Sequence, residues 1–289
     1  MRAVLPAVRI VVAFLVALLL WTPAQAGSIF LTGHDPDFHA IAGNTVGAQH
    51  INQAAIGFIL DPTFNAFVAA APKFLFVQSN IPVPSGHLNG KQGIVASGYT
   101  EGVDFDQHDA STLNAALNGL GTTYSGIVVA SDFGGLLTQA ELDILNARSA
   151  DIISFLNAGG GLYAMSEGNG GAHLTPSGGH FGYLPFIVTS TNLDQTESGY
   201  TVTPFGASLG LLNSDVNGNF SHVVFTGTGG MTIVDVDAAG RILSLATRSK
   251  IDDTGVVPEP GTLILLGSGI AAIGGRRLRR KGSAPVSRA

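Results

Sequence analysis

Short apolar runs recur along the chain and predict buried strands. Each of the first four runs is almost wholly apolar; the first ends at Gly33, and the second ends in the polar residues Gln78 to Asn80. Continuous apolar runs of four to eight residues are typical of strands that are covered on both faces of a sheet. The predicted strands are residues 28–32, 74–77, 126–130 and 161–165.

Helical patterns lie between these runs. Thr138 and Glu141 have the spacing of a capping box, and an apolar stripe follows from Leu142 to Leu156 before the chain reaches Gly159 and Gly160. This pattern predicts one helix from residue 138 to 157. A second helix is expected from about Asp109 through Leu117.

Further apolar segments, several with alternating polarity, predict antiparallel strands at residues 186–189, 222–225, 231–236 and 242–246. Strands that alternate with helices indicate an α/β fold with crossover connections. We therefore expect one domain, residues 27–250, with a Rossmann- or flavodoxin-like, mostly parallel sheet sandwiched by helices. Residues 251–256 are expected to be a polar linker.

The N-terminus has the pattern of a secretory signal peptide. Arg2 and Arg9 precede the apolar run 10–20, and Ala24-Gln25-Ala26 offers small residues for signal peptidase. We expect residues 1–26 to be removed. The alternative is an N-terminal membrane anchor, although the run is shorter than the roughly 20 residues that a spanning helix needs.

The C-terminus repeats this polarity in reverse. Val257-Pro258-Glu259-Pro260 precedes an apolar span, residues 261–275, and a basic cluster, residues 276–281, which a tail of residues 282–289 follows. Basic residues that flank a span stay in the cytoplasm, so the body is expected outside the inner membrane, with the precursor crossing that membrane once as a short helix. The alternative is an ordinary tail anchor that is never cut.

This tripartite end resembles the PEP-CTERM sorting signal of Gram-negative bacteria, and the residues that carry the resemblance are Pro258, Glu259, Pro260, Arg276, Arg277, Arg279 and Arg280. The resemblance implies recognition by an exosortase, cleavage near Pro-Glu-Pro and delivery to the cell surface or the exopolysaccharide matrix. The expected partners are therefore signal peptidase, the exosortase and exopolysaccharide.

Charge and cysteine content limit what the body can do. Residues 27–255 hold six of the 14 basic and 19 of the 20 acidic residues, a formal charge of −13. Such a surface disfavours nucleic acid as a partner and favours cations or hydrated polymers. The chain has no cysteine, which excludes disulfides, thiolate metal ligands and a cysteine nucleophile.

The segment from Gly159 to Gly168 resembles the class I glutamine amidotransferase-like superfamily, in which a glycine-rich turn and a buried strand lead to a nucleophile elbow. The elbow maps to Ala164 through Gly168 and places Ser166 where the family has cysteine. The resemblance implies a late histidine as base, which matches His222, with Asp215 or Glu167 as the acid. Without the thiolate we expect no amidotransferase activity; a serine hydrolase is the alternative, and a small turn residue at position 166 is the structural interpretation.

A loop after the first predicted strand carries a second kind of chemistry. His34, Asp35, Asp37 and His39 follow Gly33, at the sheet edge where open α/β folds bind ligands. These residues are candidate ligands for a divalent cation, although their spacing matches no recurrent zinc motif, and a hydrogen-bonded polar loop is the alternative. Asp104, Asp106 and Asp109 form a weaker candidate for calcium, and residues 215–219 fail the EF-hand spacing and predict a turn.

Three functions are consistent with these patterns. The first is a surface or matrix protein that is delivered by an exosortase and has an inactive amidotransferase-like domain. The second is an exported serine hydrolase that uses Ser166 and His222. The third is a cation- or ligand-binding module at residues 33–39.

Overall fold

The computed structural model describes residues 27–80, 90–132, 136–166, 181–184, 188–196, 198–252 and 255–257. Its centre is a ten-stranded mixed sheet with the order β3-β2-β4-β5-β1-β10-β8-β6, in which β9 pairs with β10 and β7 pairs with β9. The strands are β1 (Ser28–Thr32), β2 (Lys73–Val77), β3 (Phe105–His108), β4 (Tyr124–Val129), β5 (Gly161–Met165), β6 (Ser190–Thr196), β7 (Thr201–Val202), β8 (Ser221–Phe225), β9 (Thr232–Val236) and β10 (Ile242–Thr247).

The sheet has two halves that meet at β1. Strands β3, β2, β4, β5 and β1 are mutually parallel, whereas β10, β8, β6, β9 and β7 are joined by antiparallel pairs. β1 is hydrogen-bonded on both sides: Ile29 lies opposite Leu162 of β5 and opposite Thr247 of β10. The expectation of a mostly parallel sheet is therefore corrected to a mixed sheet. The C-terminal strands pair antiparallel with one another and, through β10, with β1, so they form half of the same sheet.

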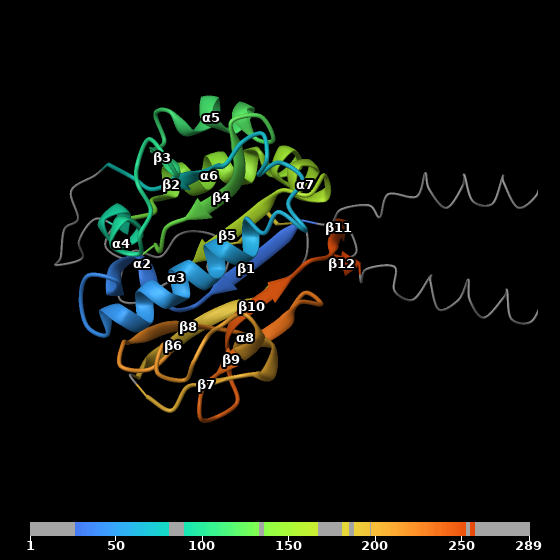
Figure 1. The fold of residues 1–289 in the computed structure, drawn as a ribbon. Helices are drawn as coiled ribbons and strands as arrows, with labels where there is room; N and C mark the ends of the chain where they lie inside the picture. Colours follow the sequence, from blue (N-terminus) through green and yellow to red (C-terminus); the bar gives the residue numbers. More distant parts are fainter. Residues whose placement is uncertain are drawn as a thin grey trace, which may run out of the picture.

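Helices cover both faces of the parallel half (Figure 1). One face carries α2 (Pro36–His39), α3 (Thr45–Ile59) and α4 (Gly90–Ala96); the other carries α5 (Leu113–Ala116), a 3-10 turn at Leu117–Gly119, α6 (Gln139–Ala147) and α7 (Ser149–Asn157). α8 (Pro204–Ser208) packs on β9 of the antiparallel half. The result is a three-layer α/β arrangement.

Two apolar cores follow from the alternation of side chains along each strand. In β1, Ile29 and Leu31 face the core under α6 and α7, whereas Phe30 packs edge-on against Phe58 of α3 and against Tyr163. All three β1 side chains have no exposed surface. The prediction of strands buried on both faces is confirmed at this position.

Several predicted elements differ in detail. The helix expected over residues 138–157 is two helices, α6 and α7, with a break at Arg148, although its capping box forms: the Thr138 N–H donates to Glu141 Oε2 at 3.0 Å. The helix expected near 109–117 shortens to α5 and the 3-10 turn. β6 begins at Ser190, after the strand that was expected at 186–189, and residues 185–187 lie outside the described residues.

The segment expected to be a linker contains a hairpin instead. β11 (Lys250–Asp252) pairs antiparallel with β12 (Gly255–Val257), and β11 packs beside α7. The signal peptide and the apolar span 261–275 lie outside the described residues. Among the helices that the structure does describe, none combines the length and apolar character required to cross a membrane.

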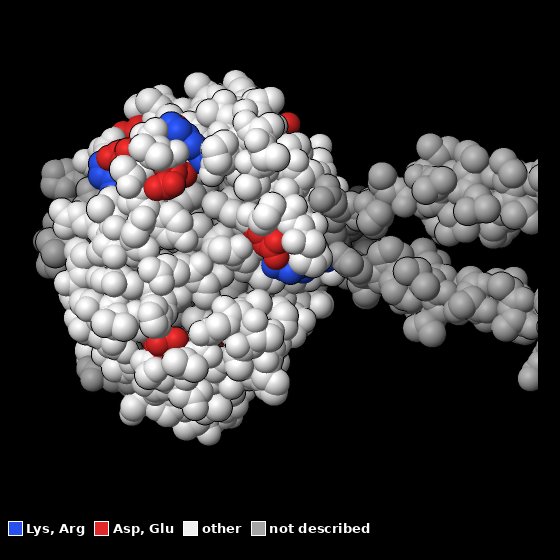
Figure 2. Space-filling model, in the orientation of Figure 1, with Lys and Arg blue, Asp and Glu red and all other residues white. Residues whose placement is uncertain are grey.

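Basic side chains of the described domain pair with acidic ones. Lys73 bonds Asp106 at 3.1 Å, and Arg248 bonds Asp61 at 2.8 Å while its guanidinium lies over the rings of Phe58 and Phe64. Figure 2 shows one face of the molecule, on which the blue basic side chains lie against red acidic ones. At these positions the few basic side chains of the domain are neutralised by acidic neighbours.

A glycine permits the closest approach of two helices on the α3 side. A Cβ at position 93 in α4 would overlap the backbone carbonyl oxygen of Asp37 in α2, whereas a Cβ at the exposed Gly57 of α3 would meet nothing within 4 Å. Replacement by alanine at Gly93 therefore adds a steric clash, whereas replacement at Gly57 adds only the higher helix propensity of alanine.

We predict opposite effects on stability for Gly93→Ala and Gly57→Ala. The first should lower the free energy of unfolding by about 1–3 kcal/mol through overpacking, and the second should raise it by about 0.5–1 kcal/mol. Urea unfolding followed by far-ultraviolet circular dichroism measures both, since the only tryptophan, Trp21, precedes the domain. Equal effects of the two variants would show that α2 and α4 do not touch at Gly93.

Candidate functional site

The candidate residues gather at the C-terminal edge of the parallel strands, next to the antiparallel half. β1 ends at Thr32, and the chain then passes from β10 towards β8: the Gly33 N–H donates to Leu243 O at 2.7 Å, and His34 forms an isolated antiparallel bridge with Ser221. The loop 33–39 and the start of β8 are thereby brought together. This is the edge at which open α/β sheets bind ligands.

His34 belongs to a buried chain of hydrogen bonds. Its Nε2 lies 2.7 Å from Asp235 Oδ2 in β9, and its Nδ1 is bonded to the Ser221 hydroxyl. The carboxylate holds the proton on Nε2, so Nδ1 accepts from the hydroxyl. Because Ser221 has no exposed surface and His34 only 5%, this serine–histidine–aspartate chain fastens the loop to β8 and β9.

Asp37 fastens the same loop to the parallel half. Its two carboxylate oxygens accept from the backbone N–H of Ser131 at 2.9 Å and from the Ser131 hydroxyl at 2.8 Å, just beyond β4. Asp37 itself has no exposed surface. The Asp37 carboxylate thus faces the end of β4, whereas the Asp35 carboxylate faces His39.

Asn52 of α3 supports the short helix α2 from the side. Its amide donates to Pro36 O at 2.9 Å, and its Oδ1 accepts from the Tyr163 hydroxyl at 3.0 Å. Complete burial raises the pKa of Tyr163 well above its ordinary value, which keeps the hydroxyl protonated as a donor. The position of α2 therefore rests on a buried polar network between α3 and β5.

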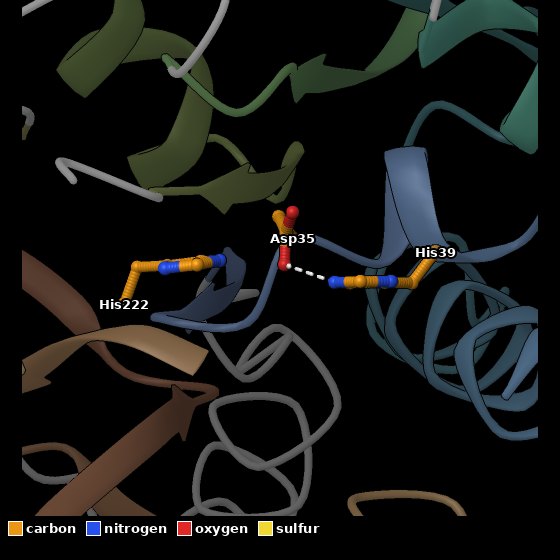
Figure 3. Close-up of side chains that lie close together, drawn as sticks. All are labelled: Asp35, His39 and His222. Atoms are coloured by element: carbon orange, nitrogen blue, oxygen red, sulfur yellow. Dashed lines mark ion pairs between the residues drawn. The ribbon is translucent and has the colours of Figure 1, made fainter. Parts of the chain in front are cut away.

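Asp35, His39 and His222 converge at the centre of the site. One ligand atom from each lies within 4.8 Å of the others, and all three residues are buried. Asp35 Oδ1 and His39 Nε2 are 3.3 Å apart. Figure 3 shows the rings of His222 and His39 approaching the Asp35 carboxylate from opposite sides. Within the described part of the chain, no other three histidine, cysteine or acidic side chains offer ligand atoms this close together.

A pocket opens beside this group. It contains about 200 Å³ of empty space, and its walls include Asp35, His39, Asp215, Asn219 and Phe220. Asp215 Oδ1 lies 3.2 Å from Nδ1 of His50, a residue whose side chain is about half exposed, and Asp215 Oδ2 accepts from the Leu212 N–H. Part of this space is open solvent, so the enclosed volume is well below the roughly 300–1,000 Å³ of drug-sized ligand sites, and the pocket suits water or an ion.

The elbow residue Ser166 directly follows β5. Its N–H donates to Thr32 O at 3.0 Å, and its hydroxyl lies 3.5 Å from Asp132 Oδ1. The side chain has no exposed surface. Glu167 and the loop that contains His173 and His180 lie outside the described residues. The use of Ser166 with His222 and Asp215 remains a prediction, and the structure places His222 beside Asp35 and His39 while Asp215 binds His50.

The three candidate calcium ligands are engaged separately. Asp104 accepts from the Thr100 N–H, and Asp106 pairs with Lys73. Hydrogen bonds from the side chains of Ser111 and then Asn80 lower the pKa of Asp109. In the predicted turn at 215–219, Gly218 takes a positive φ of 87°.

Sequence reasoning missed which histidine joins the loop residues. It grouped His34 and Asp37 with Asp35 and His39, and it assigned His222 to Ser166. The i and i+4 spacing of Asp35 and His39 is visible in the chain, but His222 is 183 residues beyond His39. The roles of Asp235 and Ser221, which hold His34, carried no signal in the chain apart from their place in apolar segments.

The buried chain through His34 gives a stability prediction. Asp235→Ala should lower the free energy of unfolding by about 3 kcal/mol, because it leaves a buried imidazole N–H without its acceptor. The matched control is Asp143→Ala, which removes an exposed carboxylate and should change stability by less than about 0.5 kcal/mol. Chemical denaturation measures both, and similar values for the two variants would contradict a structural role for Asp235.

Comparison with protein families gives one match: residues 256–280 match the PEP-CTERM protein-sorting motif. It supports the residues that were predicted from the sequence, including Pro258 to Pro260 and the four arginines 276, 277, 279 and 280. No family match supports the resemblance of the body to amidotransferases, and no curated protein matches the chain. The chain is an exported protein that carries a PEP-CTERM sorting motif at its C-terminal end.

Proposed function

We propose that this chain is an exosortase substrate whose α/β domain works outside the cytoplasm, at the cell surface or in the exopolysaccharide matrix. The observation that carries the proposal is the sorting motif at residues 256–280. In the proposed order, signal peptidase removes residues 1–26, the span 261–275 holds the precursor in the inner membrane, and the exosortase cuts near Pro258-Glu259-Pro260.

The fold supports this order because both ends of the domain lie at one pole. The first residue of β1, Ser28, pairs with Gly161 at the start of β5, and the β11–β12 hairpin packs beside α7, which leads into β5 (Figure 1). The loop 33–39 follows the opposite end of β1, which at about 3.3 Å per residue is some 16 Å away. A domain held at residue 257 would therefore direct the candidate site away from the membrane.

Charge supports a role among hydrated polymers and ions. The body carries six basic and 19 acidic residues between 27 and 255, and its basic side chains are largely paired. Net charge far from zero favours solubility and repels anionic partners such as nucleic acid. We propose that the domain has no amidotransferase activity, and the buried Ser166 hydroxyl beside Asp132 makes a serine hydrolase the weaker proposal.

Replacement of Pro258, Glu259 and Pro260 by alanine should block sorting. In a host that has the matching exosortase, the variant should stay in the inner-membrane fraction at precursor mass, whereas the wild-type chain reaches the surface fraction at lower mass. Cell fractionation with mass spectrometry of the C-terminal peptide measures both properties.

The control changes Asp253 and Thr254, which lie just before the matched motif, to alanine. This variant should be processed like the wild type. Surface delivery of the Pro-Glu-Pro variant at the wild-type mature mass would overturn the proposal.

A further inference from the structure

We infer that Asp35, His39 and His222 bind one divalent transition-metal ion, with Zn²⁺ the best suited, in a site whose remaining coordination position faces the pocket beside α3. This assignment goes beyond export and sorting. It rests on the three converging side chains, on the hydrogen bond that orients His39, and on the pocket that reaches two of the three residues.

The orientation of His39 favours a metal ion. Its Nδ1 lies 3.0 Å from the backbone carbonyl oxygen of Ala42, and a carbonyl can only accept, so Nδ1 carries the proton. In the neutral ring Nε2 is then a lone pair, and it faces Asp35 Oδ1. Two electron-pair donors directed at one another are held together by a proton on His39 or by a metal cation between them. A backbone carbonyl on the far nitrogen is the usual support of a metal-bound histidine.

The spacing of the ligand atoms also fits a zinc ion. Asp35 Oδ1 and His39 Nε2 are 3.3 Å apart, longer than the roughly 2.7–2.9 Å of a charge-assisted hydrogen bond. Protein–zinc bonds of about 2.0–2.2 Å in tetrahedral geometry place neighbouring ligand atoms about 3.3–3.5 Å apart. The third ligand atom, from His222, lies within 4.8 Å of both, a separation that a small side-chain rotation brings to the same value.

The backbone that carries the three ligands is held in place by hydrogen bonds. His34 directly precedes the ligand Asp35, and Ser221 directly precedes the ligand His222. The Ser221 hydroxyl is hydrogen-bonded to the His34 ring, which ties the two ligand-bearing segments together. Asp35 and His39 are separated by one turn of α2, which Asn52 and Asp37 hold in place. Precise metal sites need supports of this kind around their ligands.

The pocket gives access to the site, and the types of its ligands select among metal ions. Asp35 and His39 line the pocket, which opens to solvent, and Asp215 adds a carboxylate to its wall. Two imidazoles favour zinc and neighbouring transition metals over Ca²⁺ and Mg²⁺, which prefer oxygen ligands. Three protein ligands with one exchangeable position is the arrangement of zinc sites that keep a bound water.

The test is a metal titration of the full chain, purified in detergent with an affinity tag that contains no histidine and freed of metal by a chelator. Isothermal titration with ZnCl₂ should give one site per chain, with much weaker binding of CaCl₂ and MgCl₂. Asp35→Asn, His39→Ala and His222→Ala should each weaken Zn²⁺ binding by more than the 10- to 100-fold that changes around a metal site usually cause.

Two controls keep the result specific. His108→Ala removes a histidine of β3, at the far edge of the sheet, and should leave Zn²⁺ affinity unchanged. Circular dichroism of each metal-free variant should match that of the metal-free wild type, which separates loss of a ligand from loss of the fold. Absence of a stoichiometric Zn²⁺ site in the wild type, or wild-type affinity in both His39→Ala and His222→Ala, would overturn the inference.

Discussion

The hydrogen bonding of β1 on both of its edges is the constraint on which this structure depends. β1 pairs in parallel with β5 and antiparallel with β10, so a single five-residue strand joins a helix-covered parallel half to an antiparallel extension. Because β10 begins at Ile242, its pairing with β1 ends at Thr32 and Gly33, and the chain that follows can pair with β8 at Ser221. That single step carries Asp35 and His39 to His222. A purely parallel sheet would have placed a helix connection there instead.

The parallel half could be predicted from the sequence because its strands are covered on both faces. Every residue of β1 and β5 is buried, and the interior positions of both strands are apolar. The capping box of Thr138 and Glu141 was equally predictable from the sequence, since it depends on residues three positions apart. The break at Arg148 was not, because the apolar stripe continues through it and only tertiary contacts decide that α6 and α7 are separate.

The location of the candidate site could be predicted from the sequence, but the set of side chains that meet there could not. Histidines and aspartates that follow the first buried strand indicate the C-terminal edge of the sheet, and they lie there. Which of them face one another depends on long-range pairings: His34 is taken by Asp235, 201 residues away, and Asp37 by Ser131, 94 residues away. The spacing of residues within the loop does not indicate partners that are so distant in the sequence. The resemblance to amidotransferases grouped His222 with Ser166, which stays a prediction, and the bridge between His34 and Ser221 brings His222 beside Asp35.

The position of β1 also sets the timing of folding. Ile29 lies opposite Thr247, so the central strand is synthesised first and its antiparallel neighbour last. Closing a loop of that length costs entropy before any of its contacts form, and topologies with many distant pairings fold slowly. The sheet cannot be completed until the chain has been made as far as residue 247, and the sorting motif begins at residue 256. The last strand that completes the central pairing of the sheet and the sorting motif are therefore synthesised within about ten residues of each other.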